Sequence, residues 1–498
     1  MVRAGALKEI ELPLVIETTE LPEEELKWCT VRLQEVLAKG NRLEASVFNI
    51  EGKHAREVLK QCKWPLTVFA GEKGLSECYH RGRFKRIWVE KSDLPIFQPS
   101  QIEEIKPKPT GFLSSLTRTD IDALRVRKGQ ILLTCSGTIG NCSFVGKTLD
   151  KQIFSHDLIR ISAKKETDAG FLYAFLRTKI SNALVRTNQY GAVVKHIEPE
   201  HLEDIPIPNP PDILKKKIHD LIIKSYDLRD ESNVLLDKAE ALLYEALDLP
   251  PLDKLRPRYF NAGVGLRNYS VKLSKLDGRF DGSYHVPIVE SIIKQLNKEA
   301  AEVTTVGDPR ISVRVILPGR FARVYVEEGQ GTVFFGGKQL LELDPANKKY
   351  LSLIHHGERI KKELRLEKNM VMITVSGTVG KAALAPEHWE GWAANQHIIR
   401  IVPSSLNIAG YLYVFLATDY GHELITRFTY GAVVDEIDAS QVSQIAVPIL
   451  KDASTQKEIN HLALEANSKR AEAYRLEQEA IKIINEEVIR AENKEVAI

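Results

Sequence analysis

Two short stretches of the chain combine hydroxyl side chains with glycines and occupy corresponding places in its two halves. Ser136 and Thr138 stand in "SGTIG", and Ser376 and Thr378 stand in "SGTVG". Hydroxyls and exposed backbone N–H groups of such a turn can bind phosphates or the edges of nucleic-acid bases. The same residues also suit a tight turn that is needed for its geometry alone, because glycine tolerates a positive φ. Both interpretations stay open, since recurrence fits either.

Basic side chains gather in the stretch "HRGRFKR", residues 80–86, and its counterpart "PGRFAR" retains part of the charge. The candidate binding residues are Arg81, Arg83, Lys85 and Arg86 in the first half and Arg320 and Arg323 in the second. Arginine is the commonest reader of guanine edges and also binds phosphates. A solvated charged strand face is the alternative interpretation.

A third repeated stretch reads "YGAVVKHI" at residues 190–197 and "YGAVVDEI" at residues 430–437. Tyr190, Lys195, His196 and Tyr430 are therefore further candidates for contacts with nucleic acid. The second copy replaces the basic pair by Asp435 and Glu436. We therefore expect Lys195 and His196 to contribute to a difference between two binding sites and not to a shared backbone contact.

The cysteines give no sign of a metal site or a disulfide framework. There are five, an odd number, and all lie in the first half of the chain. The counterparts of Cys135 and Cys142 are Val375 and Ala382, which cannot bind zinc. We interpret these cysteines as small reduced core residues.

Three patterns that resemble catalytic motifs do not meet the requirements of the chemistry. Ser136 precedes the first glycine of its turn, whereas a nucleophile elbow needs G-x-S-x-G. "NPPD", residues 209–212, has Asp212 where a base-flipping methyltransferase needs an aromatic residue, and we interpret it as the start of a helix. His156 has Gln396 opposite it in the repeat, so we interpret it as a packed or surface histidine. The sequence therefore predicts no catalytic and no metal-binding residues.

The repeat extends over nearly the whole chain. "LRVRKGQILLTCSGTIG" aligns with "LRLEKNMVMITVSGTVG", "GFLYAFLRT" with "GYLYVFLAT", and "IEPEHLEDIPIP" with "IDASQVSQIAVP". Each copy reads as mixed α/β, and the runs "QILLTC" and "CSFVG" predict a hairpin around the glycine turn. The sequence therefore predicts two copies of one domain.

A heptad pattern follows each copy. Leucine recurs at positions 214, 221, 228, 235, 242 and 249, with the interleaved residues Ile218, Ser225, Ser232, Ala239 and Ala246. The second pattern comprises Ile459, Leu462, Ala466, Lys469, Ala473, Leu476, Ala480 and Ile483. Such a helix of 36 residues would span about 54 Å. We expect the two helices to pair antiparallel within the chain, giving a pseudo-two-fold molecule. An intermolecular coiled coil is the alternative, and Lys469 would weaken the seam.

The predicted fold is thus mixed α/β, with two repeated globular domains separated by two long antiparallel helices. The predicted divisions are an N-terminal segment 1–27, domain 1 at 28–208, spacer helix 1 at 209–249, a linker at 250–267, domain 2 at 268–448, spacer helix 2 at 449–490 and a tail at 491–498.

Length and composition agree with such an organisation. The 498 residues are too many for one core, and 43% hydrophobic with 27% charged residues is ordinary for a soluble protein. The net charge of +2 neither requires nor excludes a polyanionic partner, because the distribution of charge decides binding. No apolar run resembles a signal peptide or a membrane span, so we expect a cytoplasmic protein.

The order of these motifs, their duplication and the helical spacers resemble the specificity (S) subunits of type I restriction-modification systems, over about residues 28 to 490. The resemblance implies that each domain is a target recognition domain for one half of a split DNA sequence. It further implies that the helices set the gap and dock two methyltransferase (M) subunits, to which restriction (R) subunits can be added. The S subunit itself would be non-catalytic and without a cofactor, and S-adenosylmethionine would bind the M subunits.

Two other classes of function stay open from the residues alone. One is a paired-head adaptor that binds protein instead of nucleic acid. The other is a self-contained DNA methyltransferase or nuclease, which would require a cofactor or metal constellation.

Overall fold

The computed structural model describes residues 30–38, 41, 45–191, 193–255, 269–276, 278–431 and 433–490. The predicted segments 1–27 and 491–498, residues 256–267 of the predicted linker, and Cys29 lie outside the described residues. We call residues 45–208 head 1 and residues 269–449 head 2. Helix α1 (Leu33–Ala38) precedes head 1, and α7 (Leu252–Leu255) precedes head 2.

Head 1 contains two four-stranded sheets and a separate strand pair. The first sheet is antiparallel, in the order β2 (Ser76–Tyr79), β9 (Leu158–Ala163), β6 (Ile131–Thr134) and β7 (Cys142–Phe144). The second has the order β3 (Trp88–Val89), β5 (Gly111–Leu113), β4 (Pro95–Phe97) and β8 (Ile153–Phe154), with β4 and β8 parallel. Strands β1 (Leu66–Val68) and β10 (Pro206–Pro208) form the pair.

Head 2 repeats this arrangement strand for strand. Its sheets are β12 (Ser312–Ile316), β19 (Ile398–Pro403), β16 (Val371–Thr374) and β17 (Ala382–Leu384), and β13 (Tyr325–Val326), β15 (Lys349–Ser352), β14 (Gly331–Phe335) and β18 (Ala393–Ala394). Strands β11 (Glu302–Thr305) and β20 (Ala446–Ile449) form the pair. The register also repeats, since Ile131 lies opposite Ile161 and Val371 opposite Ile401. The predicted duplication is therefore confirmed.

Short helices complete each head. Head 1 has α2 (Ile50–Lys60), α3 (Ile121–Leu124), α4 (Ala169–Leu176) and α5 (Lys179–Thr187); head 2 has α8 (Pro287–Glu299), α9 (Leu353–Arg359), α10 (Leu406–Ala417), α11 (Asp419–Thr426) and α12 (Ala439–Ser443). Thr178 caps α5 and Thr418 caps α11, each accepting a backbone N–H bond with its hydroxyl.

Strand β6 shows why its sequence is a continuous apolar run. Leu132 packs with Phe97 and Phe154 on one face of the sheet. Ile131 and Leu133 lie on the other face, in the core that contains α4. All four residues of β6 are buried, because both faces of this sheet are covered.

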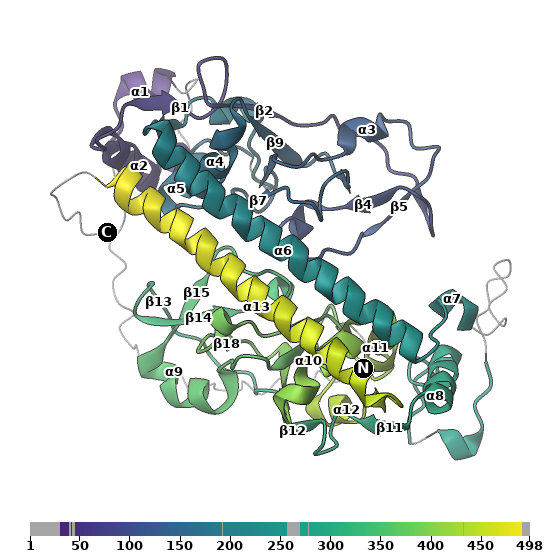
Figure 1. Ribbon diagram of the computed structural model, residues 1–498. Coiled ribbons are helices and arrows are strands. Elements are labelled where there is room, and N and C mark those ends of the chain that lie inside the picture. Colours follow the sequence, from purple (N-terminus) through teal and green to yellow (C-terminus); the bar gives the residue numbers. More distant parts are fainter. Residues whose placement is uncertain are drawn as a thin grey trace, which may run out of the picture.

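Two long helices join the heads and lie side by side in the middle of the molecule (Figure 1). They are α6 (Asp212–Ala246) and α13 (Ala453–Ile483). An ion pair of 3.4 Å joins Lys217 to Glu487 near one end, and one of 2.8 Å joins Lys238 to Glu458 near the other. The partners rise along one helix as they fall along the other, so the pair is antiparallel and intramolecular, as predicted.

Small residues let the two helices approach closely. Ser225 and Ala473 are fully buried, and the Ser225 hydroxyl donates to the Ala473 carbonyl oxygen at 2.7 Å. The leucines of the heptad within α6 are only partly buried, and Leu249 lies beyond the end of the helix. Lys469 forms a 2.8 Å ion pair with Glu231 of α6, so this polar position is used in the contact between the helices.

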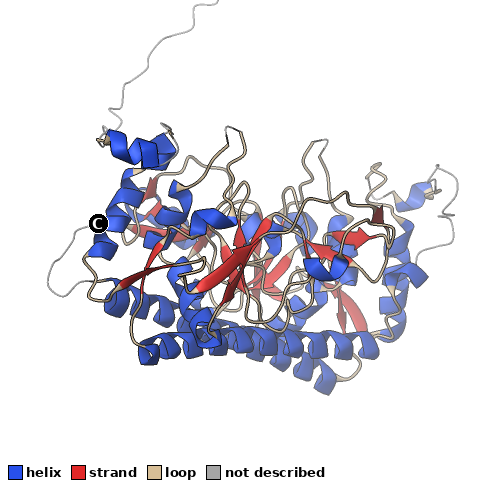
Figure 2. Cartoon of the chain, turned by 90° about the horizontal axis from the view of Figure 1, so that it is seen from above, coloured by secondary structure: helices blue, strands red, loops and turns tan. Residues whose placement is uncertain are grey.

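Each head is fixed to the helix pair at an equivalent point. The backbone N–H of Gly170 donates to His219 Nδ1 of α6 at 3.1 Å, and that of Gly410 donates to Asn460 Oδ1 of α13 at 2.8 Å. A Cβ on either glycine would lie within 2.7 Å of the long helix, so only glycine permits this approach. The strands of both heads lie to the same side of the helix layer (Figure 2).

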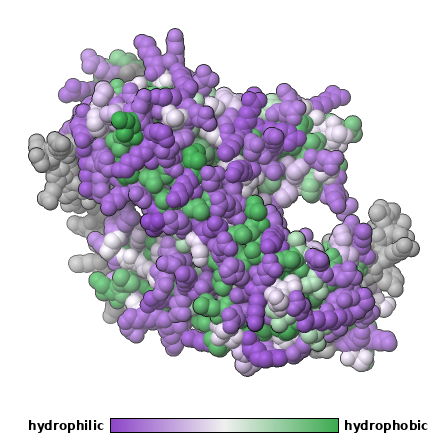
Figure 3. All heavy atoms as spheres, viewed as in Figure 1, coloured by the Kyte–Doolittle hydropathy of each residue, from purple (hydrophilic) through white to green (hydrophobic). Residues whose placement is uncertain are grey.

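The surface on the helix side is mainly hydrophilic, with hydrophobic residues scattered along the helix pair (Figure 3). Ile213 and Val234 of α6 are among the exposed ones, with 87% and 66% of their surface accessible. Single exposed apolar residues are normal in soluble proteins, so they do not by themselves define an interface.

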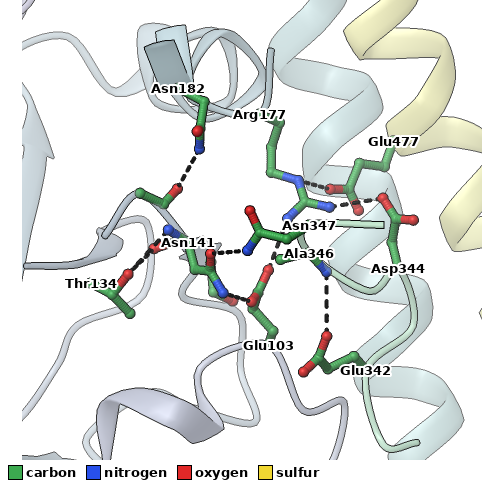
Figure 4. Close-up of polar contacts among 12 residues, drawn as sticks. Glu103, Thr134, Asn141, Arg177, Asn182, Glu342, Asp344, Ala346, Asn347 and Glu477 are labelled. Atoms are coloured by element: carbon green, nitrogen blue, oxygen red, sulfur yellow. Dashed lines mark hydrogen bonds and ion pairs between the residues drawn. The ribbon is translucent and has the colours of Figure 1, made fainter. Parts of the chain in front are cut away.

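A buried polar junction connects the two heads to the helix pair (Figure 4). The Arg177 guanidinium lies 3.0 Å from a Glu103 oxygen of head 1, 2.8 Å from Asp344 of head 2 and 3.3 Å from Glu477 of α13. The heads also touch directly, because the backbone N–H of Ile105 donates to the Leu341 carbonyl at 3.1 Å. One guanidinium therefore fixes three parts of the molecule relative to one another.

The junction contains more carboxylates than its cations can accommodate without a change in pKa. Burial raises the pKa of Glu103 to about 7 despite its contact with Arg177. Burial and the nearby Glu103 raise the pKa of Glu342 to about 8. Burial acts in the same direction on Asp344, but Arg177 and Lys348 hold its pKa below the ordinary value.

Candidate nucleic-acid interface

The glycine turn and the "YGAVV" loop of head 1 are joined at their bases. The backbone N–H of Gly137 donates to the Lys195 carbonyl at 3.0 Å, and the Ser136 hydroxyl lies 2.8 Å from His196 Nδ1. Tyr190 and His196 exchange two backbone hydrogen bonds of 2.9 and 2.8 Å. Thr138 is exposed and Ser136 is half-buried. The structure thus brings these predicted residues together.

The basic segment of head 1 adjoins the same loop. His80 Nε2 lies 3.1 Å from Glu198 Oε2, and Glu198 also accepts a hydrogen bond from the Tyr190 hydroxyl. This bond, with burial added, raises the pKa of Tyr190 to about 12, while Arg83 opposes the shift. Arg83 is thereby placed near the loop.

The remaining basic residues of the segment differ in their surroundings. The Arg81 guanidinium lies over the Tyr79 ring at 4.8 Å from its centroid. Arg86 lies 3.9 Å from Asp157, and Arg83 and Lys85 are exposed. Burial lowers the pKa of His156, and the positive charges of Arg86 and Arg83 lower it further. Head 1 therefore presents several cations beside its turn and loop.

Head 2 has the same backbone arrangement with different charges. Gly377 donates to the Asp435 carbonyl at 3.0 Å, and the Ser376 hydroxyl donates to Glu436 at 3.4 Å. Arg320 lies 3.4 Å from Glu436, and Arg323 donates to the Gln396 side chain at 2.7 Å. Tyr430 and Thr378 are exposed. Around the turn and loop, head 2 is therefore closer to electrical neutrality than head 1.

Three residues that were not among the predicted site residues hold this surface together. Asp157 pairs with Arg86 and Glu198 contacts His80 in head 1, and Gln396 binds Arg323 in head 2. Asp157 and Gln396 belong to stretches that differ between the copies, whereas Glu198 lies in a repeated stretch with Asp438 opposite it. Nothing in the local sequence indicates these contacts. Only the fold brings them next to the basic segment.

The turn residue Ser136 and His196 do form a hydroxyl–imidazole contact, which raises the question of a nucleophile. The equivalent position in head 2 is Glu436, so the pair is not part of the repeated site. In the described residues no carboxylate lies within hydrogen-bonding distance of the second ring nitrogen of His196. The contact therefore serves to join the turn to the loop.

The other patterns that could suggest chemistry have structural roles. Asp212 of "NPPD" lies in the first turn of α6 and pairs with Lys165 at 2.6 Å. Burial raises the pKa of the Cys135 and Cys142 thiols to about 11 and about 12, and the four described cysteines are free. No group of His, Cys, Asp and Glu side chains suited to a metal ion occurs in the part of the chain that the structure describes.

A family model described as "Type I restriction modification DNA specificity domain" matches residues 90–233 and 338–462. The chain belongs to this family. Each match includes both the glycine turn and the "YGAVV" loop of its head. The protein is accordingly a DNA-specificity protein of type I restriction-modification, with two recognition domains.

Solved structures of type I systems are similar to this specificity protein at low identity. An S subunit from M. genitalium shares 14% identity, with 88% of this chain and 97% of that chain covered and a TM-score of 0.29. The HsdS subunit from Thermoanaerobacter tengcongensis shares 14%, with 82% and 96% covered and a TM-score of 0.26. A chain from a structure on the assembly and conformational transition of the type I R-M system shares 15%, with 84% and 98% covered and a TM-score of 0.27.

No curated protein matches the sequence. Among the described residues of this specificity protein, no helix has the length and apolar character that crossing a bilayer requires.

Proposed function

We propose that each head of this specificity protein reads one half of a split, asymmetric DNA target. The observation that supports this most is the repetition of one turn, loop and basic segment on two heads that are fixed at different points along an antiparallel helix pair. A pseudo-two-fold protein can present equivalent surfaces to two sites on a duplex, which itself has local two-fold symmetry. The charges differ between the heads at positions 195–196 and 435–436, so the half-sites should differ.

The predicted site residues take three kinds of role in this proposal. Arg81, Arg83, Lys85, Arg86, Arg320 and Arg323 bind phosphates or guanine edges, while Ser136, Thr138, Ser376 and Thr378 bind phosphates through hydroxyl and backbone N–H groups. Tyr190 and Tyr430 pack against the DNA backbone beside the loop. These roles rest on exposure and charge, which are the properties that phosphate and base contacts require.

The helix pair sets the gap between the half-sites. The two anchor points, at His219 and at Asn460, are separated by roughly twenty residues of helix, or about 30 Å along the axis. One turn of duplex DNA is about 34 to 36 Å. The proposal therefore places the centres of the two half-sites about one turn apart.

The chemistry belongs to partner subunits in this proposal. Two methyltransferase subunits dock on the helix pair, bind S-adenosylmethionine and methylate the DNA, and restriction subunits join the same complex to cleave it. The specificity protein carries no active site and no cofactor of its own, and it works in the cytoplasm.

A first experiment separates DNA recognition from protein binding. The protein is purified with its methyltransferase subunits, and duplex binding is measured over a range of salt concentrations. Each phosphate contact should make the slope of log K against log salt steeper by about 0.9. A flat salt dependence with weak binding would instead support the paired-head adaptor.

A second experiment tests the division of labour between the heads. Residues 50–190 are exchanged for the corresponding part of another family member, and the methylated sequence is determined. One half-site should change while the other half and the gap stay the same. A change in both halves, or in neither, would contradict the proposal.

A further inference from the structure

The loops at residues 190–196 and 430–436, described except for residues 192 and 432, form the same backbone hydrogen bonds on different heads. In each loop the tyrosine exchanges backbone hydrogen bonds of 2.9 and 2.8 Å with the residue six positions later. The residue before that one accepts a 3.0 Å hydrogen bond from the glycine of the neighbouring turn, Gly137 or Gly377. Lys195 and Asp435 therefore occupy equivalent positions on equivalent supports.

Both loops extend away from their heads. Val193 is 95% exposed and Val433 is 96% exposed, so neither valine packs against its own head. The turn is tight because Gly191 and Gly431 have φ values of 102° and 114°. A Cβ on either glycine would lie 2.2 Å from the carbonyl oxygen of the second valine, so no other residue fits. Each loop is therefore a narrow projection on a hydrogen-bonded base.

The charge on this common support is inverted between the heads. Lys195 carries an ammonium group at the position where Asp435 carries a carboxylate. Neither side chain takes part in a hydrogen bond or ion pair with any residue that the structure describes. The following residues are engaged, because His196 contacts Ser136 and Glu436 contacts Ser376 and Arg320. In each loop the first of the two neighbouring residues, Lys195 or Asp435, thus has a side chain that remains available to a ligand.

We propose that these loops read bases in the major groove and that the inverted position gives the two heads opposite preferences. Lys195 donates to the N7 and O6 acceptors of guanine, and Asp435 accepts from the N4 amino group of cytosine. Asp435 cannot bind a DNA phosphate, because both groups are negative, so this position is not a phosphate contact that the two heads share. This inference rests on the proposed function and names the base class that each loop selects.

The test is a reciprocal change of charge in the complex with the methyltransferase subunits. Lys195→Asp and Asp435→Lys are prepared separately, and bound duplexes are selected from a random library and sequenced. Lys195→Asp should change one position of one half-site from guanine to cytosine, and Asp435→Lys should change one position of the other half-site in the opposite sense. The preference at that position should shift about tenfold or more, while the rest of the target is retained.

Two further variants sharpen the result. Asp435→Asn should shift the selected base from cytosine to adenine, because an amide can bind the N6 and N7 atoms of adenine. Lys60→Asp makes the same charge change on the exposed surface of α2 and should leave the selected target unchanged.

Several outcomes would overturn the inference. Uniformly weaker binding with unchanged base preference would make Lys195 a backbone contact. Loss of methyltransferase subunits with the target intact would make the loops a protein-docking surface. If the unaltered protein selected no split target at all, the proposed function itself would fail, which is a different result from an unaltered base preference in the variants.

Discussion

Two arginines, Arg160 and Arg400, are fully buried at equivalent places in the two heads. Arg160 donates to the Leu124 carbonyl at 3.1 Å, and Arg400 donates to the Leu364 carbonyl at 3.3 Å. Burial lowers their pKa values to about 10 and about 9. The sequence showed an arginine in both "LIRI" and "IIRI" but gave no sign of burial, because charged residues are normally exposed.

The sequence indicated which residues could bind a ligand, but it could not predict which residues they contact within the fold. Arg83 and Arg320 are basic residues beside a repeated glycine, and this pattern made them candidates. Their partners near the loop, such as Glu436, come from stretches more than a hundred residues away. Such long-range pairs depend on tertiary structure and have no local signal.

Glu342 predicts a pH dependence of stability. Its carboxyl has a pKa of about 8 in the folded protein, above the ordinary value of 4.5 that applies when the chain is unfolded. The folded state therefore holds a proton that the unfolded state has lost, and stability falls as pH rises from about 4.5 through about 8. Glu342→Gln removes this loss and should be more stable than the unaltered protein at pH 9 by about 1 to 2 kcal/mol.

Denaturant unfolding at pH 5 and pH 9 measures this effect. The advantage of Glu342→Gln should be small at pH 5 and grow toward pH 9, whereas Glu90→Gln on an exposed strand end should show no such trend. An advantage that shrinks with rising pH would contradict the assignment.

Arg177 predicts a large loss of stability when the junction is broken. Arg177→Met removes the cation and leaves Glu103, Asp344 and Glu477 buried without it. Removing one partner of a buried ion pair typically costs about 3 to 5 kcal/mol. Arg475→Met removes an exposed ion pair with Glu472 and should cost less than about 1 kcal/mol. Equal effects of the two variants in denaturant unfolding would show that the junction does not stabilise the molecule.

At the scale of elements, the helix pair was predicted from heptad spacing, and its packing was predicted only in part. The small residues Ser225, Ala239 and Ala473 lie in the buried seam, as their spacing indicated. The leucines are half-buried at the sides, because they border the heads as well as the other helix. The heptad pattern could not reveal the contact with the heads, since it describes a helix that packs against one other helix.

The closeness of the helices predicts a strong effect of added volume. Ala473 is 0% exposed, and its carbonyl oxygen accepts the Ser225 hydroxyl bond. Ala473→Leu should lower the free energy of unfolding by about 1 to 3 kcal/mol, because the seam has no room for the larger side chain. Glu479→Leu on the exposed side of α13 is the matched change and should have little effect. If Ala473→Leu were neutral in denaturant unfolding, the seam would be looser than the structure shows.

At the scale of the whole molecule, the duplication, the mixed α/β heads and the self-paired helices could all be predicted from the sequence. These features could be predicted because a repeat that covers about half the chain provides many independent sequence matches between the two copies, from "SGTIG" to "YGAVV". The direct contact between the heads through Ile105 and Leu341 was not predicted. It depends on the position of each head along the helix pair, which no local pattern contains.

The helix pair predicts a defined change in the DNA target when it is lengthened. Seven residues inserted into α6 after Leu228 and seven into α13 after Ala471 add about 10 Å between the anchor points while keeping the same helix faces in contact. The gap should increase by about three base pairs, at 3.4 Å each. Methylation-site sequencing measures the gap. An unchanged gap would show that the helices do not set the spacing, and insertion into one helix alone should disrupt the pairing.

We propose that one chain reads two separate DNA sequences with two similar heads. Selection of duplexes from a random library by the unaltered protein with its methyltransferase subunits tests this proposal. We expect two short, unlike specified blocks separated by a gap of fixed length and free sequence. A single continuous block, or two identical blocks, would contradict it.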